Sequence, residues 1–231
     1  MLRASVLLAI SALAVPIQSG ARSRFGLEPG REWIYTGSAR WTTDGNRVDS
    51  GSVHWVMQCL AVRSRNGLRA ALVRGWVHEL AWYAPGDRPS FSALIEYRER
   101  LYVIDAADSA IAVESIAHAL RTDPRALSSG SAVIDSGLAA GRLYGGEPDR
   151  GDRPDAFYAW HVEGPVSVAD QAPWRRLALV PSGWRIAYRT RPDHEVLDFV
   201  PGIGITRYVY SHHGTVADTD VRLVAVRDAP R

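Results

Sequence analysis

The chain has 231 residues and a formal net charge of +2, and all 27 of its basic residues are arginine. Because the arginines are scattered rather than clustered, the sequence lacks the electrostatic footprint of a nucleic-acid-binding protein. The absence of lysine excludes Schiff-base chemistry, a Walker phosphate-binding lysine and a serine–lysine dyad.

Residues 1–21 have the pattern of a secretory signal peptide. Arg3 precedes an apolar run from Ala4 to Val15, and Ser19-Gly20-Ala21 supplies the small residues that a signal peptidase recognises. The run is shorter than the roughly 20 apolar residues that span a bilayer, and no cysteine stands near the predicted cleavage site. We therefore expect an exported protein, periplasmic or extracellular, with no transmembrane span in the mature chain and no lipid anchor.

Residues 22–231 are expected to form a single β-rich domain that begins with an antiparallel meander. Three long segments at 31–43, 47–64 and 68–83 are separated by Asp44-Gly45 and Asn66-Gly67. Such dipeptides between β-type runs are strong signals for two-residue hairpin turns. Residues 89–97 and 100–105 are expected to extend the sheet.

The hydrophobic period changes at 108–124, where Ile111, Ile116 and Leu120 make an apolar stripe at helical spacing. This pattern predicts one amphipathic helix packed on the sheet. Residues 144–156 are dense in Gly, Pro and Asp, which is typical of a loop, and we expect it to be mobile. Strands are predicted again in the rest of the chain, at 157–164, 175–181, 183–190, 195–201, 204–212 and 219–226.

These elements predict a mainly β protein with minor α content. The expected architecture is a strongly curved antiparallel sheet or half-barrel, with one packed helix in its concavity or across its mouth. The single cysteine, Cys59, lies in the apolar run VHWVMQCLAV. It cannot form an internal disulfide, and we expect a buried, inert thiol.

Adjacent His212 and His213 are predicted at the tip of the last hairpin. Neighbouring side chains of an extended strand point to opposite faces, so the pair cannot reach one metal ion. With His213-Gly214 as a two-residue turn, His213 has a positive φ and Arg207 faces Asp220 across the hairpin. No His, Cys and carboxylate cluster of ligand spacing accompanies the pair, so neither a metal nor a cofactor is predicted.

Two-residue turns at Asp44-Gly45 and Asn66-Gly67 place Tyr35, His54 and Glu79 opposite one another on three strands. A histidine between a phenol and a carboxylate can act as an acid–base site. The alternative interpretation is a satisfied polar row within a sheet.

A second catalytic candidate is a pair of Asp-Ser-Gly strings, at Asp49 and Asp135. They resemble the Asp-Ser/Thr-Gly signature of aspartic proteases, in which two carboxylates share one proton. Alternatively, each string is an ordinary turn, since Asp-Ser-Gly favours turns, and the same register places Asp49 opposite Arg40.

Aromatic residues are expected on both faces of the early sheet, with Trp33, Tyr35 and Trp41 on one and Trp55, Trp76 and Trp82 on the other. One helix cannot cover both faces. Either the remaining strands close over them as a filled core, or an apolar concavity remains that can take an acyl chain or another amphiphile. The residues expected to line it are Trp33, Tyr35, Trp55, Trp76 and Trp82.

The segments LEPGREWIYTG (27–37), VEGPVSVAD (162–170) and LDFVPGIGITRYVYSHHG (197–214) resemble a group of bacterial exported proteins of unestablished function. That group shares a Leu-x-Pro-Gly-x-x-Trp-x-Tyr entry strand and a late Pro-Gly-x-Gly turn. Its sheets are similar to the half-barrels of the periplasmic lipoprotein carriers LolA and LolB. The resemblance implies a curved antiparallel sheet and carries over no catalytic residue.

The function predicted from these features is a non-enzymatic cell-envelope protein that binds an amphiphilic, lipid-like ligand or a partner segment in an aromatic-lined concavity. Two alternatives stay open. One is a hydrolase that uses Tyr35, His54 and Glu79 or the Asp49/Asp135 pair, and the other is a structural or interaction module with a filled core.

Overall fold

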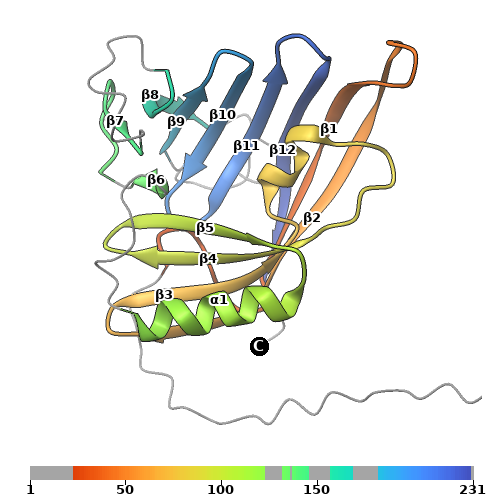
Figure 1. The fold of residues 1–231 in the computed structure, drawn as a ribbon. Coiled ribbons are helices and arrows are strands. Elements are labelled where there is room, and N and C mark those ends of the chain that lie inside the picture. Colours follow the sequence, from red (N-terminus) through yellow and green to blue (C-terminus); the bar gives the residue numbers. More distant parts are fainter. Residues whose placement is uncertain (1–22, 123–131, 136, 146–156, 169–181, 230–231) are drawn as a thin grey trace, which may run out of the picture.

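The computed structural model describes residues 23–122, 132–135, 137–145, 157–168 and 182–229. The predicted signal peptide, residues 146–156 of the predicted loop and the strand predicted at 175–181 lie outside the described residues. Within them, twelve strands form a single antiparallel sheet accompanied by one α-helix and one 3-10 helix (Figure 1). The elements are β1 Glu32–Thr42, β2 Val48–Arg65, β3 Leu68–Arg74, η1 Val77–Trp82, β4 Phe91–Tyr97, β5 Arg100–Ala106, α1 Ser109–Arg121, β6 Ala132–Asp135, β7 Leu143–Tyr144, β8 Trp160–Ser167, β9 Ser182–Arg189, β10 Asp193–Val200, β11 Gly204–His212 and β12 Ala217–Arg227.

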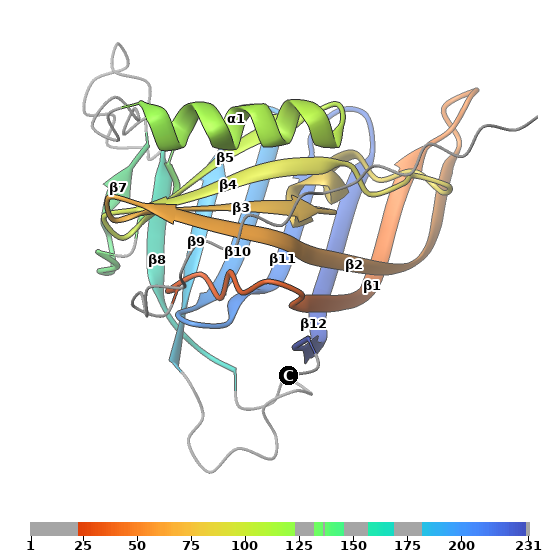
Figure 2. The same cartoon turned by 90° about the horizontal axis from the view of Figure 1, so that it is seen from below.

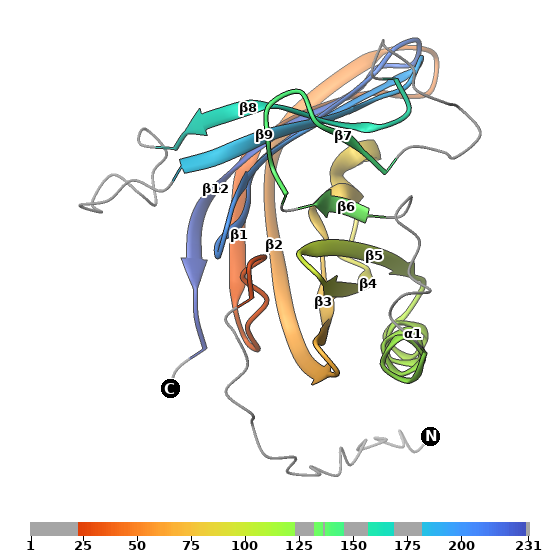
Figure 3. The same ribbon diagram turned by 90° about the vertical axis from the view of Figure 1, so that its left-hand side faces the viewer.

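The sheet is strongly curved and nearly closed, which confirms the predicted fold class. Its strand order is β6-β5-β4-β3-β2-β1-β12-β11-β10-β9-β8-β7, so pairing of the first and last strands joins two meanders. Figure 3 shows how the curvature brings the edge strands β6 and β7 near each other. The Tyr144 hydroxyl on β7 donates a hydrogen bond of 2.9 Å to the Val133 carbonyl on β6, which links the two edges.

Helix α1 begins where Asp108 accepts hydrogen bonds from the backbone N–H groups of Ala110 and Ile111. It packs through Ile116 and Ala119 against the outer face of β3 to β5 (Figure 3). Both predicted positions of the helix, in the concavity and across its mouth, are therefore wrong, because the helix lies outside the sheet and the inner face of these strands packs against the other half of the sheet. No helix among the described residues is long and apolar enough to cross a membrane.

The helix also buries a different stripe from the one predicted. Ile116 is buried as expected, together with Ala112 and Ala119, but Ile111 is 45% exposed. The buried side of the helix, with Ala112, Ile116 and Ala119, is the one that contacts β3 and β4.

The first hairpin has a longer turn than predicted, and this changes which side chains share a face. Thr42 pairs with Val48, and Gly45 and Asn46 have φ values of 81° and 60°. Because the pairing is shifted by one residue from a two-residue turn, every side chain of β2 changes face relative to β1. Tyr35 consequently lies opposite Trp55, and aromatic residues predicted on opposite faces, Trp33 and Tyr35 on one and Trp55 and Trp76 on the other, gather in one inner core.

The third long segment is a strand only as far as Arg74. Gly75 has a φ of 74°, and a Cβ atom at this position would lie 2.7 Å from the Val56 carbonyl oxygen. The chain turns here and continues as η1 on the inner side of the sheet, where the Thr219 hydroxyl donates a hydrogen bond of 2.8 Å to the Leu80 carbonyl. The prediction of a strand through residue 83 is therefore wrong.

The last hairpin also differs from its prediction, but its faces are preserved. Four residues, 213–216, separate β11 from β12, and Gly214 rather than His213 has a positive φ, of 121°. The pairing is displaced by two residues, so that Tyr210 lies opposite Thr219. Since a two-residue displacement keeps each side chain on its face, Arg207 still forms the expected ion pair with Asp220, through contacts of 3.0 and 2.6 Å.

Cys59 is fully buried in the inner core, and burial raises the pKa of its thiol to about 12. At pH 8 the thiolate fraction of such a group is about a thousandth of that of an exposed cysteine. We expect a thiol reagent at pH 8 to react with the folded protein at least about 100 times more slowly than with the urea-unfolded chain. Equal rates measured by absorbance would contradict the buried position of Cys59.

Candidate functional site

The segment at residues 23–30, here called the plug, crosses the lower end of the sheet between its two halves (Figure 2). On one side, the Ser23 hydroxyl and the Arg24 N–H donate hydrogen bonds of 2.7 and 3.0 Å to the Glu96 carboxylate of β4. On the other side, the Gly202 N–H in the β10–β11 turn donates to the Arg24 carbonyl. The plug contains no helix or strand, and these polar contacts fasten it to both halves of the sheet.

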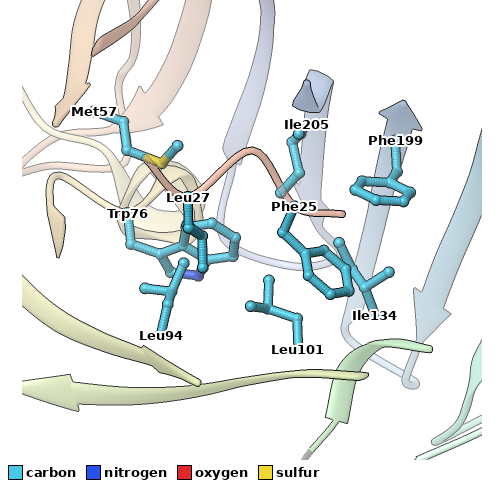
Figure 4. A pocket seen from close by; sticks show the side chains of 10 residues that line it. Phe25, Leu27, Met57, Trp76, Leu94, Leu101, Ile134, Phe199 and Ile205 are labelled. Atoms are coloured by element: carbon cyan, nitrogen blue, oxygen red, sulfur yellow. The ribbon is translucent and has the colours of Figure 1, made fainter. Parts of the chain in front are cut away.

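The plug inserts two apolar side chains, Phe25 and Leu27, into the sheet interior, where both are buried. The ring centroids of Phe25 and Phe199 are 5.4 Å apart. A residual cavity of about 10 Å³ adjoins these side chains (Figure 4). Its lining includes Phe25, Leu27, Met57, Trp76, Phe199 and Ile205. A cavity of this size holds about one water molecule, so the interior is nearly filled by side chains.

The two sequence motifs that carried the family resemblance contact each other at the lower end. Arg31, from the Leu-x-Pro-Gly-x-x-Trp-x-Tyr segment, donates to the Gly202 carbonyl of the Pro-Gly-x-Gly turn at 3.4 Å. Trp33 Nε1 donates to the Ile203 carbonyl of the same turn at 2.6 Å. The motifs therefore form one structural unit, which anchors the plug and the start of β1 to the β10–β11 turn.

Four of the five aromatic residues predicted to bind a ligand are buried in the core. Trp33 Nε1, the Tyr35 hydroxyl and Trp55 Nε1 each donate to a backbone carbonyl, of Ile203, Ile205 and Gly75, at 2.6, 2.9 and 2.9 Å. Burial also raises the pKa of Tyr35 far above its ordinary value. Trp76 is buried beside the cavity, whereas Trp82 is 54% exposed at the end of η1.

The structure does not bring Tyr35, His54 and Glu79 together. His54 lies opposite Thr36 with its side chain exposed, on the face away from Tyr35. Glu79 belongs to η1, where its Oε2 accepts a hydrogen bond of 2.8 Å from the Ser90 N–H, and burial raises its pKa. The predicted row depended on a two-residue first turn and on a longer third strand, and neither is present.

Asp49 and Asp135 each bind arginine rather than each other. Asp49 pairs with Arg47 at 2.9 Å and lies opposite Trp41, so the predicted register against Arg40 is wrong. Asp135 is buried and contacts Arg100 and Arg142 at 3.0 and 2.7 Å. The two aspartates lie on β2 and β6, which β3, β4 and β5 separate in the sheet order.

A polar and aromatic cluster that sequence reasoning missed lies between η1 and the inner face of β8 to β11. His78 Nδ1 is 2.9 Å from Glu195 Oε1, and the imidazole stacks on Trp76 with ring centroids 5.1 Å apart. The Tyr208 ring lies 5.5 Å from the imidazole. A carboxylate beside Nδ1 orients a histidine so that Nε2 is free for acid–base chemistry, but His78 Nε2 is itself buried without a partner.

Nearer the upper rim, Asp193 accepts a hydrogen bond of 2.6 Å from the Tyr210 hydroxyl and lies 3.0 Å from His212 Nδ1. Burial acts to raise the pKa of Asp193, but hydrogen bonds from His212, Tyr210 and Thr190 outweigh it and hold the pKa below its ordinary value. The exposed Trp82 ring lies 4.6 Å from the His212 ring. Among the described residues, no three His, Cys, Asp or Glu side chains are grouped as metal ligands.

Part of this cluster could have been predicted by assigning alternate residues of each strand to the two faces of the sheet. Asp193 and Glu195 stand two residues apart at the start of a strand whose same face continues with buried Leu197. Polar residues at alternate positions on an otherwise apolar face indicate buried polar contacts. The position of His78 beside Glu195 could not be predicted in this way, because residues 77–82 were expected to form a strand.

No protein-family model matches the chain, and no curated protein matches its sequence. Two solved structures are similar over 90% of this chain and 100% of their own. One is a candidate lipoprotein from Parabacteroides distasonis ATCC 8503, with 6% identity and a TM-score of 0.43. The other is a candidate exported protein with a YmcC-like fold from Bacteroides fragilis NCTC 9343, with 10% identity and a TM-score of 0.42. At these levels of identity and structural overlap, neither supports a statement about the activity, ligand or location of this chain.

Proposed function

We propose that this protein is an exported, non-enzymatic protein of the cell envelope that holds the apolar chain of an amphiphile inside its curved sheet. The location rests on the signal-peptide pattern of residues 1–21. The observation that carries the ligand proposal is the cavity of about 10 Å³ whose wall includes Phe25 and Leu27 of the plug. A ligand chain would take the place of these two side chains when the plug swings away from the lower end.

The energies involved are compatible with such an exchange. Burying a Phe or Leu side chain stabilises by about 1.5–3 kcal/mol, so withdrawing both costs about 3–6 kcal/mol. Each methylene of an acyl chain gains about 0.8 kcal/mol on burial, so a chain of about eight methylenes offsets the loss. Longer chains would bind with a net gain, whereas short-chain acids would not displace the plug.

The plug contacts also suit a segment that can detach as a unit. Arg69 donates hydrogen bonds of 3.0 and 2.6 Å to the Leu27 carbonyl and contacts Glu28 at 3.0 Å. Glu96 of β4 lies directly opposite Arg69 of β3 and binds the other end of the plug. Opposite charges at facing positions of neighbouring strands can pair with each other, so departure of the plug does not leave either charge without a partner.

Substituting Leu27→Ser is expected to tighten the binding of a long-chain fluorescent fatty acid to the protein lacking residues 1–21. A serine loses most of the apolar burial of the leucine, about 1.5–3 kcal/mol, and thereby lowers the cost of displacing the plug. The affinity should rise about tenfold or more, as measured by fluorescence titration.

The matched control is Leu60→Ser, which makes the same chemical change at a position that is 45% exposed on β2, and it should leave the affinity unchanged. Native mass spectrometry of protein from its own compartment provides an independent readout. An apo mass together with no uptake of the fatty acid by either protein would refute the proposal and favour a structural module with a filled core.

A further inference from the structure

Trp76 has an indole N–H without a hydrogen-bond acceptor, although the side chain is only 3% exposed. Two other tryptophans of the same inner core, Trp33 and Trp55, differ in this respect. Trp33 and Trp55 donate to the carbonyls of Ile203 and Gly75 at 2.6 and 2.9 Å. The unpaired donor of Trp76 is therefore not a feature that it shares with Trp33 and Trp55.

The unpaired N–H belongs to an indole ring that lines the cavity beneath the plug. Trp76 lines that cavity, and Figure 4 shows its indole nitrogen on the side of the ring toward Leu94, which is also a lining residue. The stacked His78 imidazole covers one face of the indole. The indole that carries the donor is thus held at the wall of the space that the amphiphile would enter.

A buried donor without an acceptor destabilises a folded protein, because it has lost its hydrogen bond to water. One water molecule could fit the cavity by volume, but a buried water needs two to four polar partners. The side chains that line this cavity are otherwise apolar, among them Leu27, Met57, Leu94 and Leu101. The lining therefore offers a water little besides the indole, whereas a single acceptor oxygen on an apolar ligand needs only one donor.

We propose that Trp76 is a ligand-binding residue that donates its indole N–H to an acceptor oxygen of the bound molecule. This inference rests on the proposed function and narrows its ligand class to apolar chains that carry a buried ester, carboxylic acid or ketone oxygen. Plain hydrocarbon chains, and amphiphiles whose only polar group is an amine, would fill the same space without satisfying the donor.

The test uses competition against the bound fluorescent fatty acid with methyl laurate, which carries an acceptor, and n-dodecane, which carries none. Trp76→Phe removes the N–H and keeps an aromatic ring, while Trp55→Phe is the matched control because its N–H already binds Gly75. We expect Trp76→Phe to weaken methyl laurate about five- to tenfold, the effect of one hydrogen bond, and to leave n-dodecane unchanged. Trp55→Phe should leave the ratio of the two affinities as in the wild type.

Urea unfolding without ligand gives a second readout. Both Trp→Phe substitutions remove the same part of a buried ring, but only Trp55→Phe also removes a hydrogen bond, so the urea midpoint should fall less for Trp76→Phe than for Trp55→Phe. An equal or larger fall for Trp76→Phe would mean that the N–H already has an acceptor, and would overturn the inference. Equal loss of both ligands, or loss of neither, would also overturn it. If no compound binds to the wild type, the proposed function itself fails.

Discussion

Gly37→Ala is expected to prevent the sheet from folding, although it adds only one methyl group. Gly37 lies in β1 opposite Val221 of β12 and Val53 of β2. A Cβ atom at this position would lie 1.9 Å from the Asp220 carbonyl oxygen and 2.7 Å from the Val221 Cα. Both are backbone atoms of the neighbouring strand, so no rotamer change relieves the clash. The free energy of unfolding should fall by more than about 4 kcal/mol, which is beyond the usual range for a point mutation.

The measurement is the far-UV circular dichroism and thermal unfolding of the purified protein, with two controls. Ser38→Ala changes the next residue, which is exposed, and should leave the midpoint unchanged. Gly51→Ala places a Cβ 3.2 Å from the Trp41 side chain, which can move, so its effect should be much smaller. A Gly37→Ala protein that unfolds like the wild type would refute the close contact of β1 with β12.

The size of this effect follows from the place of β1 in the sheet. Pairing of β1 with β12 is what joins the two meanders, and the pairing contains an irregularity between Ile34 and Tyr35. Such irregularities bend a strand and increase its twist. The junction brings together residues far apart in the sequence, and no local pattern indicates how closely the two strands approach there.

The length of a hairpin turn was predicted correctly only where the Asn-Gly or Asp-Gly dipeptide alone determines it. Asn66-Gly67 forms the expected two-residue turn, with φ values of 52° and 76°. At Asp44-Gly45 the following residue, Asn46, also adopts a positive φ and lengthens the loop by one. Asparagine tolerates this conformation, so both loop lengths are compatible with the same string. The choice of length decided whether Tyr35 faces His54 or Trp55.

An error in the predicted strand register changes the face of every side chain when the shift is an odd number of residues, and preserves it when the shift is even. A shift of one residue in the first hairpin dissolved the predicted trio, because His54 moved to the outer face. A shift of two residues in the last hairpin kept the Arg207–Asp220 ion pair. Curvature, sheet class and the existence of one helix do not depend on register, and for this reason they could be predicted from the sequence.

The plug could not be predicted from periodicity, because it has none. Its sequence, SRFGLEPG, contains two apolar residues separated by glycine, a pattern compatible with a turn, a strand end or a disordered terminus. Its position depends on Glu96, Arg69 and the Gly202 turn, which come from three distant parts of the chain. The sequence left open whether the aromatic interior of the sheet is open or filled, and the residues that close its lower end required the structure.

Substituting the aspartates of the two Asp-Ser-Gly strings distinguishes a structural role of Asp135 from a catalytic pair with Asp49. Asp135 on β6 is buried and binds Arg100 of β5 and Arg142 next to β7. It therefore links the two edges of the sheet along the gap between β6 and β7, here called the seam. Removing one member of a buried ion pair costs about 3–5 kcal/mol. Because both arginines are about one-third exposed and can turn toward water, we expect Asp135→Ala to lower the free energy of unfolding by about 2–3 kcal/mol.

Asp49→Ala is the matched control. Its partner Arg47 is 73% exposed, and an exposed ion pair stabilises little, so the unfolding midpoint should barely change. If Asp49 and Asp135 instead formed a shared-proton pair, the two substitutions would have the same effect. Two apposed carboxylates repel each other, so either substitution would stabilise the fold, and each would abolish the same peptidase activity. Chemical denaturation of the two variants side by side distinguishes these cases, and equal stabilisation by both would overturn the assignment of Asp135 to the seam.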